Sequence, residues 1–424
     1  MSAGRIRSPP GGATAVAPAA WRTRAWAIVG ALSITETVSY GILYYAFAVF
    51  LVPMQRELGF STAQLTGAFS AGLLVSGVAG IAVGRYLDRH GPRGLMTAGS
   101  AAGVVLVLAW SQVEGLAAFY ALWVALGLVM AAVFYEPAFT VLTKHFPAST
   151  ERRRAMTVMT LVAALASFIF LPFTQSLIDA HGWRDALVIL AVILAAITVP
   201  LHGLVLREAP ATAHAGLTAA MPSSAASDVL RSGPFWLLSG AFFLASMAAV
   251  AVMVLSIPYL LERGYGAGFA AFAVGLVGIS QIPGRILFGV LAGRLAPEWS
   301  TALVFTLIAL GIGLVVSVDA TWAVVAGLVV LGMGNGMATL ARATVIADLY
   351  GPADYGAIAG VAALTTTVAR AVGPFAAAVY VAAAGYEALL WTLVAVSLVA
   401  AALAYRAEAI ALPRQRSRAT SART

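Results

Sequence analysis

The chain is a succession of long apolar runs separated by short polar segments. Most of these runs exceed the ~20 residues that an α-helix needs to cross ~30 Å of hydrocarbon. Twelve runs of spanning length follow residue 25, at about 26–54, 62–86, 94–112, 116–143, 154–178, 184–206, 234–261, 269–294, 299–318, 322–348, 355–383 and 386–405. The pattern predicts an all-α membrane protein whose twelve transmembrane helices contact the lipid bilayer.

The composition excludes most other classes of protein. Hydrophobic residues make up 61% of the chain and charged residues 10%, whereas soluble domains carry roughly 25% charged residues. The absence of cysteine excludes disulfides and thiolate chemistry. The net charge of +8 does not indicate nucleic-acid binding, because the basic residues lie mostly between the spans. The first apolar run is too long for a signal-peptide core, so we expect it to be retained as a helix.

The basic residues are distributed unevenly between the two sides of the predicted helices. If the N-terminus is cytoplasmic, 19 of the 25 Lys and Arg residues fall on inner segments, 3 on outer loops and 3 inside spans. Cytoplasmic loops of membrane proteins carry such an excess of Lys and Arg. We therefore expect both termini in the cytoplasm and a multi-pass protein of the cytoplasmic (cell inner) membrane.

The two halves of the chain resemble each other. The sequences LPF (171–173) and GWRDAL (182–187) recur as GPF (373–375) and GYEAL (385–389), about 202 residues later. Parallel repeats of this kind are typical of two-bundle transporters with a site between the halves. The expected organisation is a disordered cytoplasmic N-terminus (1–25), a six-helix bundle (26–206), a cytoplasmic linker (207–233), a second six-helix bundle (234–405) and a cytoplasmic tail (406–424).

Arg285 lies well inside the predicted span 269–294. At ~1.5 Å per residue it is more than ~10 Å from either end of that span. An arginine at such a depth costs ~2.5–3.5 kcal/mol, against a gain of ~0.3–0.6 kcal/mol per Leu or Ile. An ionisable residue within the hydrocarbon is therefore a functional-site hypothesis by default. The alternative is a fixed salt bridge inside the helix bundle.

Five further charged residues lie inside spans: Glu36, Glu136, Arg342, Asp348 and Arg370. Arg370 is near the middle of its span, and a buried guanidinium needs a compensating charge. An anionic substrate is one solution, since a guanidinium binds a carboxylate with two hydrogen bonds. A permanent pair between Arg370 and Glu36 is the other.

The two glutamates are candidate proton carriers. A carboxyl group in a low dielectric favours its protonated form, so either Glu36 or Glu136 would carry a proton in one state. Pro137 follows Glu136 directly and is expected to kink the helix. Alternatively, Glu136 and Arg342 form an inner gate pair, with Asp348 as a further gate or loop contact.

Polar and small residues occur near these charges. Tyr40 and Tyr44 share one helix face at i, i+4, where their hydroxyls would line the cavity and meet a carboxylate; aromatic packing is the alternative. Asn335 lies among glycines 332, 334 and 336, which indicates a close helix approach and a flexible point. We find no metal-ligand spacing, phosphate-binding loop or nucleophile triad, so we expect no enzyme, cofactor or metal.

The segment 84–93 (GRYLDRHGPR) carries a family resemblance. It matches the loop pattern of the major facilitator superfamily through Gly84, Asp88, Arg89, Gly91 and Arg93. Asp88 is positioned to accept hydrogen bonds from a neighbouring helix N-terminus, and the two arginines to pair with carboxylates on other cytoplasmic helix ends. These contacts would latch the inner side shut; the alternative is that the charges only set topology.

Within that superfamily the chain resembles the monocarboxylate porters and the oxalate/formate exchangers. YGILYYAFAVF (40–50), ELGFS (57–61) and GRILFG (284–289) carry this resemblance. It implies that Arg285 binds the substrate carboxylate and that Arg370 stands where the oxalate exchangers have a basic residue. The animal lactate carriers have an Asp where this chain has Gln281. Gln cannot carry a proton, so we expect no proton coupling through that position.

We therefore expect a monomeric secondary transporter that moves small organic anions, of monocarboxylate type, by alternating access. Proton symport and anion exchange remain open. Arg285 would bind the carboxylate, and the other expected binding residues are Arg370, Tyr40, Tyr44, Gln281 and Asn335. An exporter of drugs or other toxic compounds is the alternative, although LPFT (171–174) replaces the Gly-Pro-x-x-Gly-Gly type signature of proton-coupled exporters. A non-transporting anion sensor is the alternative of another class, but the tails and central loop leave little room for a signalling module.

Overall fold

The computed structural model describes residues 19–146, 149–206, 228–291, 297–350 and 355–421. Within these ranges the secondary structure is helical, without strands. The first half contains α1 (Ala19–Tyr40), η1 (Gly41–Tyr45), α2 (Ala46–Leu58), α3 (Thr62–His90), α4 (Pro92–Ser111), α5 (Leu116–Val133), α6 (Tyr135–His145), α7 (Ser149–Ala163), α8 (Ala166–Pro200) and η2 (Leu201–Val205). The second half contains α10 (Gly233–Glu262), α11 (Ala267–Leu291), α12 (Pro297–Ser317), α13 (Thr321–Tyr350) and α14 (Tyr355–Ser421).

Twelve membrane crossings are distributed over these elements. Ten helical stretches of the described residues are long and apolar enough to span a bilayer, and two of them, Thr150–Val205 and Ile358–Ala411, contain 56 and 54 residues. At ~1.5 Å per residue each of these two is more than twice as long as the ~30 Å hydrocarbon core. Each also reverses at a glycine with positive φ, Gly182 (φ 80°) and Gly385 (φ 83°). The two long stretches therefore cross twice each, and the predicted twelve-helix all-α fold is confirmed.

The helix ends differ from the prediction at both ends of the chain. α1 begins at Ala19, inside the segment 1–25 that was predicted to be disordered. α14 continues to Ser421, through most of the predicted tail 406–424. The sequences AAWRTRA (19–25) and YRAEAIA (405–411) are rich in Ala, Arg and Glu, which favour helix. Residues 1–18 and most of the predicted linker, 207–227, lie outside the described residues.

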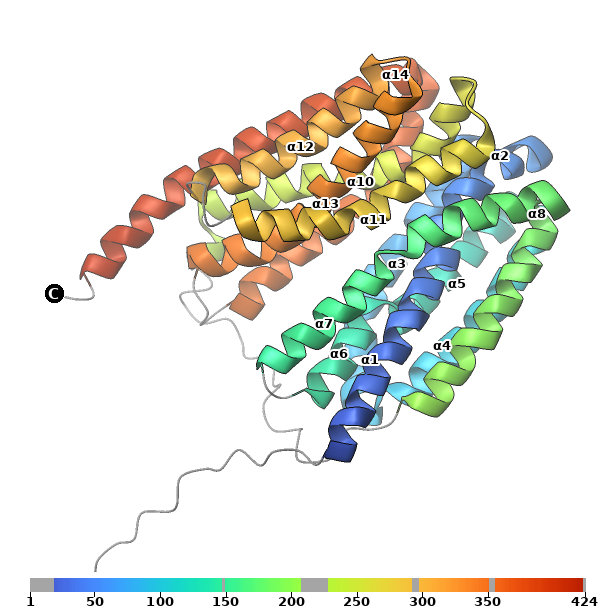
Figure 1. The fold of residues 1–424 in the computed structure, drawn as a ribbon, viewed down its shortest axis with the longest axis horizontal. Coiled ribbons are helices and arrows are strands. Elements are labelled where there is room, and N and C mark those ends of the chain that lie inside the picture. Colours follow the sequence, from blue (N-terminus) through green and yellow to red (C-terminus); the bar gives the residue numbers. More distant parts are fainter. Residues whose placement is uncertain (1–18, 147–148, 207–227, 292–296, 351–354, 422–424) are drawn as a thin grey trace, which may run out of the picture.

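The helices form two groups, α1 to η2 and α10 to α14, that converge at one end and diverge at the other (Figure 1). α1 starts and α14 ends on the diverging side, which we call the termini side. The two groups meet through three pairs of helices: α3 with α14, α8 with α11, and α2 with α10. The first two pairs are related by the sequence repeat. The α3–α14 pair joins the second crossing of the first half to the fifth crossing of the second half. The α8–α11 pair joins the fifth crossing of the first half to the second crossing of the second half.

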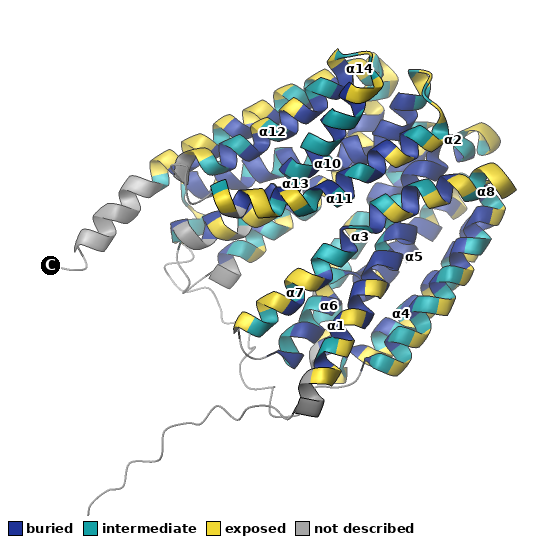
Figure 2. Cartoon of the chain, in the orientation of Figure 1, coloured by how far each residue is buried: buried dark blue, intermediate teal, exposed yellow. Residues whose placement is uncertain are grey.

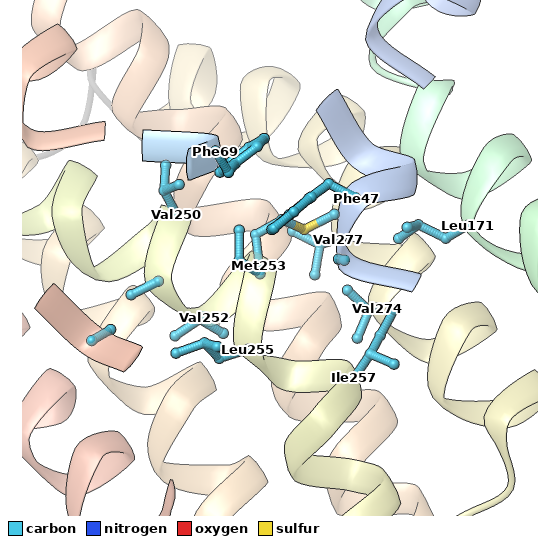
Figure 3. Close-up of a cluster of buried hydrophobic side chains, with 14 of the residues drawn as sticks. Phe47, Phe69, Leu171, Val250, Val252, Met253, Leu255, Ile257, Val274 and Val277 are labelled. Atoms are coloured by element: carbon cyan, nitrogen blue, oxygen red, sulfur yellow. The ribbon is translucent and has the colours of Figure 1, made fainter. Parts of the chain in front are cut away.

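A buried apolar cluster closes the converging side. Its side chains come from both groups of helices, as Figure 3 shows for Phe47 and Phe69 on one side and Val250, Met253 and Val277 on the other. All five are buried. Buried residues also concentrate where the two groups converge (Figure 2). The two helix groups are therefore packed together on the side opposite the termini and diverge towards the termini side.

Candidate functional site

Arg285 is positioned by a very close contact between α11 and α13. A Cβ atom added to Gly284 would lie 2.7 Å from the Met333 Cα, and one added to Gly336 would lie 2.7 Å from the Gln281 Cα. The glycines therefore allow the two backbones to touch, as the sequence around Asn335 predicted. The Arg285 side chain is half-buried. Its Nη2 donates a long hydrogen bond of 3.5 Å to Gln281 Oε1.

The Arg285 guanidinium is only partly satisfied by the protein. Its Nε is buried and has no hydrogen-bond partner among the described residues. No ion pair links it to a described carboxylate, so the fixed salt bridge that we considered from the sequence is not formed within the described part of the chain. A buried N–H without a partner costs ~1–3 kcal/mol. The guanidinium therefore retains capacity for a further acceptor.

Arg370 lies on α14 between two contacts that join the helix groups. A Cβ added to Gly67 would lie 3.2 Å from the Phe375 ring, and one added to Gly77 would lie 2.7 Å from Thr367 Cγ2. Arg370 falls between Thr367 and Phe375 in sequence and is nonetheless exposed. Within the described residues it has no hydrogen bond or ion pair to a carboxylate. Arg370 is therefore an exposed guanidinium at mid-span, beside the contacts that join the two groups.

A tyrosine cluster on the first crossing faces these arginines. The helix widens into a π-helical turn at Gly41–Tyr45, a feature frequent at functional sites. An added Cβ on Gly41 would overlap the Phe170 ring, so the turn packs directly against α8. The ring centroids of Tyr44 lie 6.0 Å from Tyr40 and 5.0 Å from Tyr45.

Two aromatic residues of the fourth crossing complete the cluster. Tyr40 stacks on Phe134 with ring centroids 4.0 Å apart, and lies 4.7 Å from Tyr135. Phe134 has extended backbone angles (φ −87°, ψ −163°), which break the helix between α5 and α6. Pro137 is in the first turn of α6, where it cannot donate to a preceding carbonyl. The predicted kink at this proline is confirmed.

Both arginines interact electrostatically with this cluster. Arg370 is close enough to Tyr40, Tyr44 and Tyr45 to interact with them electrostatically. Arg285 is close enough to Tyr45 and Tyr135 to interact with them electrostatically. The structure thus gathers five residues predicted to bind substrate: Arg285, Arg370, Tyr40, Tyr44 and Gln281, which accepts the hydrogen bond from Arg285. It adds Tyr45 and Tyr135, which were not among the predicted binding residues.

The two glutamates differ in environment. Glu36 is fully buried, and neither carboxyl oxygen has a hydrogen-bond partner among the described residues. The permanent pair between Glu36 and Arg370 is therefore not formed. Glu136 is exposed, contrary to the low-dielectric surroundings that the sequence suggested, and lies in the first turn of α6, directly after the helix break at Phe134. The two carboxyls still interact electrostatically with each other.

The remaining predicted gate residues are not brought into one site. Arg342 donates from Nη1 to Thr366 Oγ1 at 2.7 Å, and no bond to Glu136 is present, so the inner gate pair is not formed in this structure. The side chain of Asp348 lies outside the described residues. Asn335 is half-buried, one residue before the close contact at Gly336.

The loop motif 84–93 has a clear local structure. Gly91 ends α3 and precedes α4 with φ 75° and ψ 171°, a conformation that is essentially restricted to glycine. Lys144 on α6 donates to the Leu87 carbonyl at 2.9 Å, which ties the fourth crossing to the motif. Gly84 meets no neighbouring atom that a Cβ would touch. Arg89 and Arg93 are exposed, and the Asp88 side chain lies outside the described residues. Their latch function stays a prediction.

No group of His, Asp or Glu side chains within the described residues is arranged to hold a metal ion. The arrangement is instead one of two arginines, four tyrosines and two glutamates around the centre of a twelve-helix membrane protein.

Comparison with solved structures identifies proteins with the same fold. A bacterial homolog of the human lysosomal transporter Spinster, in an inward-facing and unoccupied conformation, matches with a TM-score of 0.76 and 15% identity over 92% of this chain and 98% of that one. The same protein in an inward-facing and occupied conformation matches with a TM-score of 0.73. At this identity the likeness concerns the fold alone.

Sequence relatives are more specific. Monocarboxylate transporter 13 of Bos taurus is 26% identical over 290 residues, which cover 65% of each chain, so the match spans slightly less than two thirds of that relative. The Rattus norvegicus protein of the same name is 25% identical over 77% of this chain and 75% of its own. The oxalate:formate antiporter of Oxalobacter formigenes is 22% identical over 62% of each chain.

The family model of the Major Facilitator Superfamily matches residues 35–315, which is more than half of the chain. Together with the twelve crossings, this match identifies a superfamily whose relatives named above are transporters rather than enzymes. The chain belongs to the Major Facilitator Superfamily.

Proposed function

We propose that the protein is a secondary transporter of small organic anions, of monocarboxylate type, that works by alternating access. Arg285 is the primary carboxylate ligand, and Arg370 with the tyrosine cluster completes the site. The observation that carries the proposal is that two arginines lie within membrane-spanning helices, beside the contacts that join these helices to their neighbours, and that neither is paired with a described carboxylate. The names of the relatives, monocarboxylate transporters and an oxalate:formate antiporter, support the same class of cargo.

The chemistry favours a planar anion over a neutral substrate. A guanidinium offers a rigid fork of N–H donors that fits a carboxylate. The Nε of Arg285, which has no partner among the described residues, would gain one on binding. Tyrosine hydroxyls at the same site can donate to the second carboxylate oxygen or to a hydroxyl on the acid.

Alternating access requires that the two helix groups rock about this site. The two helix groups diverge on the termini side (Figure 1), and we propose that this is the state open to that side. From the distribution of Lys and Arg we propose that this side is the cytoplasm and that the protein lies in the cytoplasmic membrane as a monomer. The opposite state would open the apolar cluster around Phe47 and Val250.

The proposal is tested by uptake of labelled organic acids into proteoliposomes. The panel contains lactate, pyruvate, oxalate and formate, with a neutral sugar and a cationic dye as competing classes of substrate. We expect uptake of at least one acid. The variant Arg285→Gln should lower its transport efficiency ~10–150-fold, as expected for the loss of a charge-assisted contact worth ~1.5–3 kcal/mol.

Arg56→Gln serves as the matched control. Arg56 is an exposed arginine at the end of α2, remote from the centre, and its replacement should leave uptake at the parental rate. Full transport of every acid by Arg285→Gln would reject the assignment of this residue. Transport of the dye but of no acid would instead support a drug exporter.

A further inference from the structure

Two helix ends on the converging side are related by the sequence repeat. α2 ends in ELG (57–59), and α10 ends in ERG (262–264). The glycine of each has a positive φ, 70° in the first half and 82° in the second, so the two helices end with the same backbone conformation. Glu57 and Glu262 therefore occupy equivalent positions in the two halves.

In the first half this glutamate is bonded within its own helix group. The turn after the fifth crossing contains Trp183, which is buried and donates from its indole Nε1 to Glu57 Oε2. The next residue, Arg184, donates from Nε to Glu57 Oε1 at 2.8 Å. Both carboxylate oxygens thus have donors from the same half, so these contacts do not depend on where the second half lies.

In the second half the equivalent donor is bonded across the two helix groups. Tyr386 follows a positive-φ glycine, as Trp183 does, and it is close enough to Glu262 to interact with it electrostatically. Its hydroxyl is nevertheless hydrogen-bonded to the side chain of Thr62, on α3 of the first half. Gln55 Nε2 donates to Thr62 Oγ1 at 2.7 Å, which leaves the Thr62 hydroxyl hydrogen for Tyr386, since a hydroxyl donates once and accepts twice.

Glu262 is consequently left without a donor. It is exposed, and within the described part of the chain it has neither a hydrogen bond nor an ion pair. The neighbouring Arg263 is engaged elsewhere, because its guanidinium pairs with Asp319 and donates to the Tyr259 hydroxyl at 2.6 Å. The second half therefore has an acceptor beside Tyr386 that the tyrosine does not use in this state.

We propose that Tyr386 is a latch with two positions: its hydroxyl bonds to Thr62 when the converging side is closed, and to Glu262 when that side opens. The inference rests on the proposed alternating access and adds a residue that controls it. Opening separates the helix groups and so takes Thr62 away from Tyr386. A half-buried hydroxyl that lost its partner would make the open state costly. The bond to Glu262, which copies the one between Trp183 and Glu57, replaces the bond that opening breaks.

The test measures how often the converging side opens. The chain contains no cysteine, so the variant Val250→Cys places a single thiol in the buried apolar cluster, where a hydrophilic maleimide reaches it only after opening. In this background, without substrate, Thr62→Val removes the partner of the closed state and should raise the labelling rate ~2–10-fold. Glu262→Ala removes the partner of the open state and should lower the rate at least ~2-fold.

The matched control uses the same two substitutions without the tyrosine hydroxyl. Tyr386→Phe removes the bond of both states, so in its presence neither Thr62→Val nor Glu262→Ala should change the labelling rate. Glu114→Ala, in the connection between α4 and α5 where the carboxyl is exposed, should label at the parental rate. Parental labelling by either single variant, or effects of the same size with and without the Tyr386 hydroxyl, overturns the latch.

A second readout separates opening from loosening of the fold. Spin labels at Arg56→Cys and Glu387→Cys, both exposed and on opposite helix groups, report the distance across the converging side. Thr62→Val should add a second, longer and well-defined distance. A broad distribution in its place would mean that the substitution unfolds the region, and it would overturn the latch. If the parent takes up no acid, the proposed function fails, whereas labelling and distances, which need no substrate, still decide whether Tyr386 is a latch.

Discussion

Replacement of Gly284 by alanine tests how the contact between α11 and α13 positions Arg285. Gly284 precedes Arg285, and its Cα faces the backbone of Met333 on α13. A Cβ there would lie 2.7 Å from the Met333 Cα and 2.8 Å from its carbonyl carbon. Carbon atoms in contact are ~3.5–4.0 Å apart, so α11 must move away from α13 by roughly 1 Å. The obstacle is backbone on both sides, which no rotamer change relieves.

The displacement has two measurable consequences. Overpacking of a well-packed interface costs ~1–3 kcal/mol, which should lower the melting temperature of the purified protein by a few degrees. A displacement of ~1 Å at a binding residue can reduce a rate ~100-fold. We therefore expect Gly284→Ala to reduce acid uptake by one to two orders of magnitude at equal protein content in the proteoliposomes.

Gly240→Ala is the matched control, because a Cβ at this glycine of α10 meets no atom within 4 Å. It should leave melting and uptake unchanged, or stabilise the helix slightly through the higher helix propensity of alanine. If Gly284→Ala melts with the parent and transports at the parental rate, the close contact does not position Arg285, and the structural argument for this residue is refuted.

Three further predictions concern other parts of the chain. Arg370→Gln should weaken binding of a dicarboxylate more than that of a monocarboxylate, by ~10-fold or more for the loss of one charge-assisted contact, as measured by competition in the uptake assay. Arg184→Ala removes an ion pair of 2.8 Å to Glu57 and a 2.6 Å hydrogen bond to the Ser111 carbonyl. Because the side chains of Arg184 and Glu57 are partly exposed, we expect the free energy of unfolding, measured by thermal denaturation, to fall by only ~1–2 kcal/mol. Equal stability of Arg184→Ala and the parent would contradict this prediction. If transport is electroneutral, an imposed membrane potential should leave acid accumulation unchanged. If each cycle moved one net charge, the free energy of accumulation would instead change by ~2.3 kcal/mol per 100 mV.

Hydropathy predicted the crossings because the bilayer leaves little choice: an apolar run of spanning length has to be a helix. The same reasoning identified Arg285 and Arg370, since a charge within such a run is conspicuous. The glycines around Asn335 correctly indicated the contact between α11 and α13. These features are visible in the sequence because each depends on residue type and depth alone.

Features that depend on the rotation of a helix could not be predicted. Glu36 and Glu136 are equivalent in the sequence, yet one is fully buried and the other exposed. A regular helical period does not reveal the π-helical turn at Gly41–Tyr45, which joins Tyr45 to the cluster. Nothing in the sequence indicated that Tyr135 belongs to the site, except its position next to Glu136 and Pro137. The gate pair of Glu136 and Arg342 depends on the state of the transporter, and here the two helix groups diverge at that level.

Binding of organic acids to the purified protein tests the central claim most directly. A ligand that binds the folded state at 100 times its dissociation constant stabilises it by ~2.7 kcal/mol. The account predicts that at least one carboxylic acid raises the melting temperature of the parent and of Arg56→Gln, and that Arg285→Gln loses this response while melting normally without ligand. A parental response of Arg285→Gln to the same acid would contradict the account.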